Sequence, residues 1–256
     1  MNLENPSQEQ EQERKRVKEH AVWLFACEQR LEDMNPPGFF QNSKNSRLRG
    51  SAISRIRQLA EIPEFPYEVL VQFHAITYFD RCFSNLSDLG GQECLDTFII
   101  TCTVLAGKRM AKSVDFPMQL FLEKNGLVNK LEDIEDMECR IRHMLNPRKE
   151  SITALSFIDF FLYLIYDNDP DQIQTAKDNE RLYKYILFMQ RDAEFVQFKP
   201  SIIAAVAIMA EKAENGPVGD FCDPILRYKS VNTVEEGQPA LAISSNRLYQ
   251  SPPMFE

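Results

Sequence analysis

The sequence predicts an all-α protein that consists of two tandem helical bundles. Apolar residues recur at helical spacing through most of the chain, and no segment shows a convincing strand pattern. Two segments, near residues 95–109 and 200–214, are apolar on nearly every side, which is typical of a helix buried at the centre of a bundle. Amphipathic segments surround each of them, so the pattern occurs twice and predicts two bundles.

The first half of the chain predicts a leading helix and one bundle. Residues 1–17, rich in Gln and Glu, are expected to form a disordered tail or the frayed start of a helix. A helix is expected over residues 19–34, where apolar residues fall near one face until Asn-Pro-Pro-Gly ends it. Five helical segments follow, the fourth of them short: residues 46–62, 67–84, 92–110, 119–124 and 131–145.

The second half of the chain repeats this pattern. Pro200 and Ser201 mark the start of the buried helix, and Asn215 with Gly216 marks its end. The expected helices are residues 154–166, 180–192, 200–214 and 223–236. The expected divisions of the chain are a disordered tail (1–17), a first bundle with its preceding helix (18–147), a second bundle (148–236) and a second disordered tail (237–256).

Composition argues against several classes of protein. The net charge of −9 and the pI of about 5.0 argue against a partner that is nucleic acid. The longest apolar runs have about ten residues, whereas a membrane helix needs about 20, and the N-terminus does not resemble a signal peptide. The six cysteines form no Cys-x-x-Cys pair, so we expect reduced thiols. We therefore expect a soluble intracellular protein with no membrane partner.

The sequence contains none of the common enzyme motifs GxGxxG, GxxxxGK[ST], HExxH and GxSxG. We therefore expect no catalytic residue, no cofactor and no small-molecule substrate. Cys139 and His143 lie four residues apart on one helix face and could both contact a metal ion. Two ligands do not close a metal site, and no other cluster of Cys and His joins them, so no metal is expected.

An acidic stretch in the second half resembles the start of a calcium-binding loop. Asp167, Asp169 and Asp171 occupy its first, third and fifth positions. The sixth position requires glycine and is Gln172, and the twelfth requires a bidentate Glu and is Asp178. We therefore interpret the stretch as a solvated acidic loop whose Asp residues start the next helix.

The first buried helix ends in a cluster of positive charge that includes Lys108. Cations suit a helix C-terminus, so Lys108 either caps its own helix or is held in place for a partner. Glu138 is also open to two interpretations, because Arg142 lies four residues further on and would form an ordinary surface pair with it.

Asp80 follows an apolar helical stripe, and a carboxylate is expensive to bury alone. It either faces solvent in a local pair with Arg81 or pairs with a cation from another helix. Arg49, in the preceding amphipathic segment, is the natural partner for the second alternative.

Four segments, in order, resemble the cyclin family. HAITYFDRCFS (74–84) resembles the A-x-x-Y-x-D-R-F-L segment, and TCTVLAGKRMAKS (101–113) resembles the buried helix that ends in L-A-x-K. Residues 134–162 resemble the segment that begins M-E-x-x-I-L, and residues 198–213 resemble the P-S-x-I-A-A-A-A helix of the second cyclin box. The order and spacing match across residues 20–215. The diverged first box, with Asn-Pro at 146–147, is similar to algal-type cyclins.

The resemblance implies two cyclin-like five-helix bundles, the second of them shortened after Gly216. It implies that Lys108 hydrogen-bonds backbone carbonyls at the end of a kinase αC helix and that Glu138 binds the same kinase segment. It also implies that Arg49 and Asp80 form the buried ion pair between helices of the first box.

One departure from the family concerns substrate docking. The helix that begins at Leu48 should contain M-R-x-x-L-x-x-W, whose Trp and apolar neighbours form a groove for docking peptides. Here the Trp position is Arg55, and its neighbours are Ser51 and Ala52. Docking peptides of the Arg-x-Leu type are therefore expected to bind poorly.

By this resemblance the chain is expected to be a cyclin of the nucleus and cytoplasm, a non-catalytic subunit that activates a cyclin-dependent kinase in cell-cycle control. The alternative is a cyclin-fold transcription or adaptor protein without kinase activation. The acidic balance counts against DNA, and Lys108 together with Glu138 counts against a peptide-only adaptor. The basic run from Arg14 to Lys18 is either a nuclear-import signal or a solvated helix turn.

Overall fold

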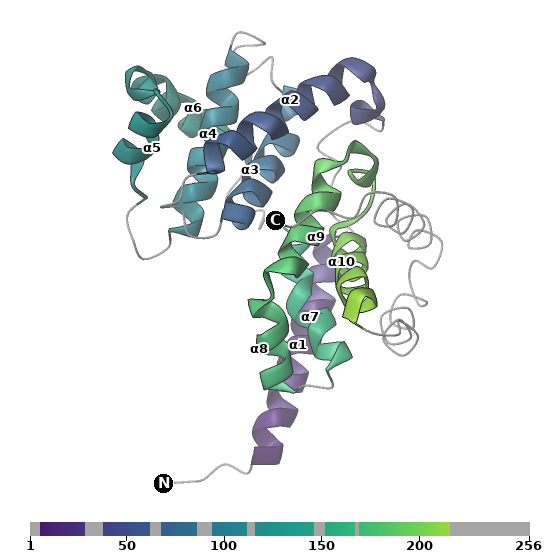
Figure 1. Cartoon of the computed structure of the whole chain (residues 1–256). Coiled ribbons are helices and arrows are strands. Elements are labelled where there is room, and N and C mark those ends of the chain that lie inside the picture. The colour runs from purple at the N-terminus through teal and green to yellow at the C-terminus, as the bar shows by residue number, and fades with distance from the viewer. Residues whose placement is uncertain are drawn as a thin grey trace. The chain divides into compact units, whose positions relative to one another are not determined.

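The computed structural model describes residues 6–28, 38–61, 68–85, 94–111, 116–145, 152–166 and 169–215. Within these ranges the regular structure is helical and includes no strand, which confirms the all-α prediction (Figure 1). The described helices divide into two compact units, one within residues 38–145 and one formed by residues 6–28 and 152–215.

The first unit is built around one buried helix. Its described α-helices are α2 (Ser43–Ala60), α3 (Glu68–Cys82), α4 (Leu95–Met110), α5 (Met118–Lys124) and α6 (Leu131–Leu145). The helix α4 contacts α2, α3 and α6, and each residue from 98 to 107 is buried (Figure 1). This confirms the prediction of a central helix near residues 95–109. Three short 3-10 turns complete the described unit: η1 (Phe39–Gln41), η2 (Phe83–Asn85) and η4 (Val128–Lys130).

Gly107 allows a close approach at the end of α4. A Cβ atom at this position would overlap the aromatic ring of Phe116, which lies just before α5 and packs against Phe121 with ring centroids 5.8 Å apart. Only glycine leaves room for the ring. The close packing therefore fixes the path of the chain beside the last turn of α4.

We expect Gly107→Ala to lower the free energy of unfolding by about 1–3 kcal/mol, because the Phe116 ring must leave its place. Gly50 is the matched control: it lies inside α2 and has no neighbouring atom within 4 Å of a Cβ. Gly50→Ala should stabilise the protein by about 0.5–1 kcal/mol through helix propensity. Urea titration of both variants measures the two effects, and a stabilised Gly107→Ala variant would contradict the packing argument.

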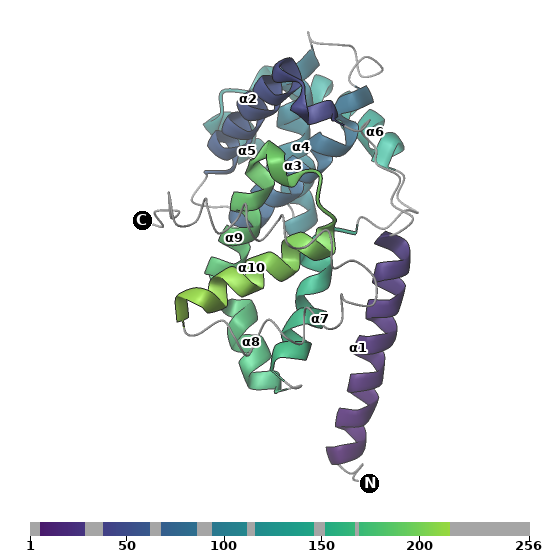
Figure 2. The same cartoon turned by 90° about the vertical axis from the view of Figure 1, so that its right-hand side faces the viewer.

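The second unit also surrounds a buried helix. Its described α-helices are α1 (Pro6–Glu28), α7 (Leu155–Ile165), α8 (Pro170–Asp178), α9 (Glu180–Arg191) and α10 (Pro200–Asn215), with a 3-10 turn, η5 (Ala193–Phe195). The helix α10 contacts α7 and α9, and residues 201–209 are all buried (Figure 2). This confirms the expected buried helix near residues 200–214.

The N-terminal helix differs from the prediction in its start and in its packing. It begins at Pro6, so of the two alternatives for this stretch, a disordered tail and the start of a helix, residues 6–17 adopt the second. Gln and Glu, which dominate this stretch, have good helix propensity, and the helix extends outward from its anchored C-terminal half. It packs on α7, where Phe25 contacts Phe157 and Phe160 with ring centroids 5.0 and 5.8 Å apart. The helix therefore belongs with the second unit, and not with the first bundle as the 18–147 division assumed.

A second contact connects the helices α1 and α10. Glu28, at the end of α1, is buried and accepts hydrogen bonds from the Ser201 backbone N–H (2.7 Å) and hydroxyl (2.8 Å). Ser201 lies in the first turn of α10, where backbone N–H groups have no partner within the helix. The carboxylate therefore caps the central helix of its unit with a charge that suits a helix N-terminus.

The acidic stretch of the second half forms a helix that the sequence did not predict. Asp169 caps α8 by accepting from the backbone N–H groups of Asp171 (3.1 Å) and Gln172 (3.2 Å), and Pro170 follows it in the first turn. An Asp residue does cap the start of a helix, as expected, but this helix is α8 and not the predicted helix over residues 180–192. Asp167, the expected helix over residues 223–236 and the tail over 237–256 lie outside the described residues.

Candidate functional site

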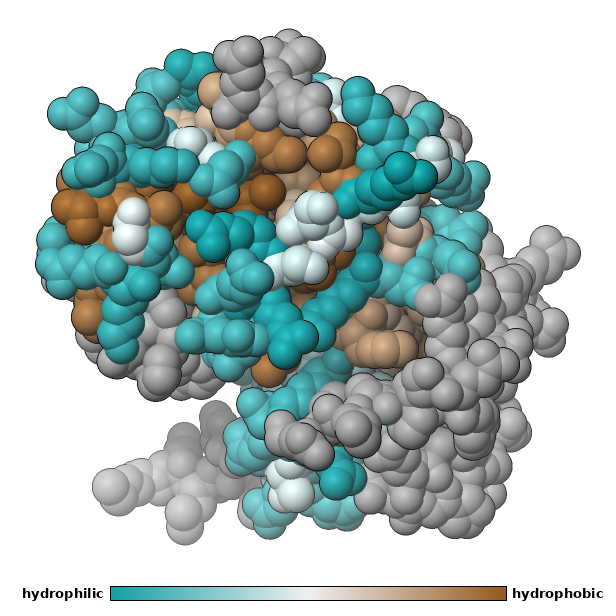
Figure 3. Space-filling model, turned by 45° about the horizontal axis from the view of Figure 1, so that its top comes forward, coloured by the Kyte–Doolittle hydropathy of each residue, from teal (hydrophilic) through white to brown (hydrophobic). Residues whose placement is uncertain are grey.

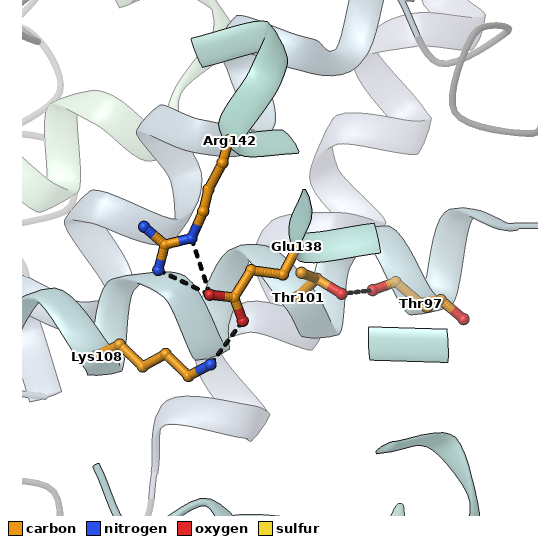
Figure 4. Close-up of polar contacts among 5 residues, drawn as sticks. All are labelled: Thr97, Thr101, Lys108, Glu138 and Arg142. Carbon is orange, nitrogen blue, oxygen red and sulfur yellow. Dashed lines mark hydrogen bonds and ion pairs between the residues drawn. The ribbon is translucent and has the colours of Figure 1, made fainter. Parts of the chain in front are cut away.

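Lys108 emerges from the core at the end of α4. The residues before it are buried through Gly107, and its own side chain is 34% exposed. Its Nζ donates to Oε2 of Glu138 on α6, at 2.6 Å (Figure 4). Because α4 and α6 pack together, this contact joins two helices of the first unit. The ammonium group is therefore fixed at the surface by the core below it.

Glu138 lies at the edge of the buried side of α6. Met137 and Ile141 on the same helix are buried, and the Glu138 side chain is only 13% exposed. Its second oxygen, Oε1, accepts from Nε (2.9 Å) and Nη2 (2.7 Å) of Arg142 (Figure 4). Both carboxylate oxygens therefore accept from cations, one on α4 and one on α6.

The electrostatics favour the charged form of Glu138. Burial raises its pKa, but the hydrogen bonds and charges of Lys108 and Arg142 outweigh this and hold the pKa below its ordinary value. The carboxylate is thus ionised at neutral pH, and the three side chains together have one excess positive charge. Arg142 is 59% exposed, so part of its guanidinium faces solvent.

The sequence left open what Lys108 and Glu138 contact, and the structure shows the contacts of both side chains. Arg142 does pair with Glu138 one turn away, as an ordinary surface pair would. The same carboxylate also accepts from Lys108, a contact across 30 residues that the local pattern did not reveal. Lys108 therefore contacts a neighbouring helix, while the Ala111 backbone N–H bonds Gly107 O at the end of α4.

Arg49 and Asp80 meet inside the same unit. Arg49 Nε and Nη2 donate to the two carboxylate oxygens of Asp80, each at 2.8 Å, which joins α2 and α3. The Arg49 side chain is 1% exposed, and its guanidinium lies 5.3 Å from the ring centre of Phe40. Of the two partners considered for Asp80, the structure thus places Arg49 against it in a bidentate pair.

This pair sits in a region where charge is expensive. Burial raises the pKa of Asp80, while the charge and the hydrogen bonds of Arg49 act in the opposite direction. The pair is therefore not a large net source of stability, but loss of one partner leaves a buried charge uncompensated.

His74 on α3 is buried between aromatic side chains. Its ring stacks on Tyr78 and meets Phe73 edge-on, with centroids 6.3 and 5.3 Å away. Burial, followed by repulsion from Arg109 and Arg81, lowers the pKa of His74 to about 3. The ring is therefore neutral at physiological pH.

We expect this histidine to make the protein sensitive to acid. An unfolded chain protonates His74 near pH 6.5 and the folded chain only near 3, so the unfolded state binds more protons in between. The free energy of unfolding should therefore fall by up to about 1.4 kcal/mol for each pH unit below 6.5. Denaturant titrations across this window should show that His74→Phe removes this component, while His143→Phe on the exposed part of α6 keeps it. Equal acid sensitivity in all three proteins would contradict the assignment.

The structure places the remaining candidates as follows. Arg55 lies 3.6 Å from Asp96, at the start of α4, and Asp96 also accepts from Lys130 at 2.7 Å. Sequence reasoning missed this cluster because its members come from distant segments with no shared pattern.

Cys139 and His143 lie on the exposed part of α6, and the described residues include no group of three or more possible metal ligands. Among these residues, no helix is both long enough and apolar enough to cross a bilayer.

Known proteins match this chain over much of its length. It is 30% identical over 166 residues to Cyclin-D3-1 of Oryza sativa subsp. japonica, which covers 64% of this chain and 47% of that protein. It is 24% identical over 215 residues to Cyclin-D4-1 of the same organism, covering 80% of this chain and 59% of that protein. It is 27% identical over 209 residues to Putative cyclin-D6-1 of Arabidopsis thaliana, covering 78% and 65%.

The matches cover only part of each of these relatives. The chain spans about half the length of the first two relatives, 47% and 59%. No protein-family model matches the chain. The relatives come from land plants, and the similarity to algal-type cyclins stays a prediction.

Proposed function

Because this chain is related to the cyclin family, we propose that it is a non-catalytic regulatory subunit that binds and activates a cyclin-dependent kinase in cell-cycle control. The observation that supports this most directly is the Lys108–Glu138 pair, which two packed helices hold at the surface of the first unit. These are the two residues that the resemblance assigns to kinase binding.

The chemistry of the pair suits the end of a helix. An ammonium group has three donors, and Glu138 takes one of those of Lys108. The others can bond backbone carbonyls, and the last carbonyls of a helix have no partner within it and bear partial negative charge. Since Glu138 already holds the lysine side chain in place, little side-chain freedom is lost on binding. The pair therefore suits the αC helix of a kinase.

Apolar side chains on α5, on η4 and at the start of α6 would add area to an interface with the kinase. Val128 in η4 is 48% exposed, and Met118, Leu120 and Leu131 are half-buried. Figure 3 shows hydrophobic residues at the surface on the side of the view where Figure 1 draws α5. A binding surface with an apolar area and a few fixed polar contacts resembles known protein interfaces.

Activation follows if this surface binds only one kinase conformation. An inactive kinase holds its αC helix away, so that its Lys–Glu pair is broken. A partner that binds the inward position shifts the equilibrium by its difference in affinity for the two states. A shift from 1:99 to 99:1 requires a difference of about 5.5 kcal/mol.

The test is co-purification of the tagged full chain from cells, with mass spectrometry, followed by kinase assays with the purified partner. We expect a cyclin-dependent kinase in the bound fraction and a rise in its activity with added protein. A chain that recovers no kinase, or that binds one without raising its activity, would contradict the proposal. A salt-titrated DNA-binding assay in parallel tests the adaptor or transcription alternative.

The proposal includes a place in the nucleus and the cytoplasm. Arg14, Lys15, Arg16 and Lys18 are exposed on the outer half of α1, where an import receptor could reach them. Lys15 and Arg16 also lie near Glu19 and Glu13, at 3.9 and 3.7 Å, as ordinary helix pairs do.

A further inference from the structure

The helix α2 has an unusual charge for a protein of this composition. The whole chain has a net charge of −9, but the 18 residues of α2 include no Asp or Glu. Its cations are Lys44, Arg47, Arg49, Arg55 and Arg57. Arg49 is buried against Asp80, and Arg57 pairs with Glu61 at 2.7 Å. The other three cations are therefore the source of the positive surface.

These cations lie along one side of the helix. Lys44, Arg47, Ser51 and Arg55 follow one another at intervals of three, four and four residues, which places them on one face. Lys44, Arg47 and Ser51 are exposed, and Arg55 is half-buried, while Ala52 behind them is fully buried. We call these four residues the α2 basic face. At 1.5 Å a residue it is about 16 Å long.

The charge of this face is little neutralised. Neither Lys44 nor Arg47 has a carboxylate partner among the described residues. Arg55 lies 3.6 Å from Asp96, but Asp96 also accepts from Lys130 at 2.7 Å, so one carboxylate serves two cations. Among the described residues, Lys44, Arg47, Arg55 and Lys130 thus share a single carboxylate, that of Asp96.

From this geometry we propose that the α2 basic face is a docking surface for an Asp- and Glu-rich peptide segment of a partner protein. A carboxylate fits the planar guanidinium groups of Arg47 and Arg55. Five extended residues span about 16 Å, which matches the length of the face. Leu48 is half-buried beside the face and offers contact for an apolar residue between the acidic ones.

Nucleic acid fits these observations less well. A duplex presents one phosphate for about 1.7 Å of its axis, and proteins that bind it neutralise many of these charges. Here four cations stand on a chain with a net charge of −9, so a long polyanion is repelled by the rest of the molecule. A short acidic peptide meets only the local field. Its binding does not depend on the kinase proposal.

The test measures peptide binding to the full chain by fluorescence anisotropy. The probe is a labelled peptide of Asp and Glu around one Leu, and its comparators are the same peptide with Asn and Gln, an Arg-x-Leu peptide and a single-stranded DNA oligonucleotide. We expect the acidic peptide to bind most tightly, and we expect its affinity to fall as the salt concentration rises. Tighter binding of the DNA or the Arg-x-Leu peptide would overturn the proposal.

Variants assign the binding to this face. The triple change Lys44→Glu, Arg47→Glu and Arg55→Glu should lower the affinity for the acidic peptide roughly tenfold to a hundredfold, as the loss of several surface ion pairs would. The control reverses Lys15, Arg16 and Arg140, three exposed cations elsewhere, and gives the same net charge. It should keep most of the affinity, and an equal loss in both triples would overturn the assignment. The Gln version of the first triple repeats the test if the Glu version does not fold.

Discussion

Replacement of Asp80 by alanine should lower the free energy of unfolding by about 3–5 kcal/mol, because the buried guanidinium of Arg49 loses the carboxylate that neutralises it. The bidentate geometry and the 1% exposure of Arg49 place this pair among those whose disruption is expensive. Thermal unfolding should show the effect as a large fall in Tm. A Tm within about two degrees of the parent would show that the guanidinium is not left uncompensated.

Two controls separate buried charge from the loss of a contact. Asp96→Ala removes an exposed carboxylate that pairs with Lys130, and should change stability by less than about 1 kcal/mol. The double variant Arg49→Met with Asp80→Leu removes both charges and fills the space with apolar atoms. It should be more stable than the Asp80→Ala variant, since no buried charge remains. If it is equally unstable, the loss arises from packing and not from charge.

The second large effect concerns the partner. We expect Lys108→Ala to weaken binding to a cyclin-dependent kinase by about 2–5 kcal/mol if the contact is buried in the complex. Its Tm should change little, because a cation at the end of a helix contributes only about 0.3–1 kcal/mol to stability. Affinity by calorimetry and kinase activity at sub-saturating protein measure the two sides of this prediction.

Arg109→Ala is the matched control, because Arg109 is an exposed cation on the same turn of α4. Glu138→Ala should weaken kinase binding as Lys108→Ala does. The double variant should lose less binding free energy than the sum of the two single losses if both side chains hold one kinase segment. Full activation by the double variant would refute the site assignment. A loss with Arg109→Ala as large as with Lys108→Ala would point to general charge instead of a specific contact.

The predictable parts of the fold are those with a strong local signal. The helices α4 and α10 are apolar on nearly every side, which a water-facing helix cannot be, so their central positions could be predicted from the sequence. Local reasoning left two alternatives for Asp80, a solvated pair with Arg81 and a pair with Arg49 on another helix. Only the resemblance to the cyclin family assigned Arg49.

The parts that the sequence did not predict depend on contacts between distant segments. The packing of α1 follows from Phe25 and Glu28, whose partners lie more than 130 residues away. No local pattern shows which bundle such a helix will join. The shared use of Glu138 by Lys108 and Arg142 was hidden for the same reason, since only one of the two cations is a sequence neighbour.

The capping of α10 by Glu28 has a consequence for biosynthesis. The ribosome completes α1 first, but Ser201 is 173 positions later in the chain. At about 5–20 residues each second, roughly 9–35 seconds separate Glu28 from Ser201, and roughly 7–26 seconds separate Phe25 from Phe157 on α7, which covers the apolar side of α1. The whole of the first unit is synthesised during this delay and can fold while α1 is still undocked. Chaperones that bind exposed aromatic residues would therefore meet Phe25 of this protein before any of the helices that later cover it.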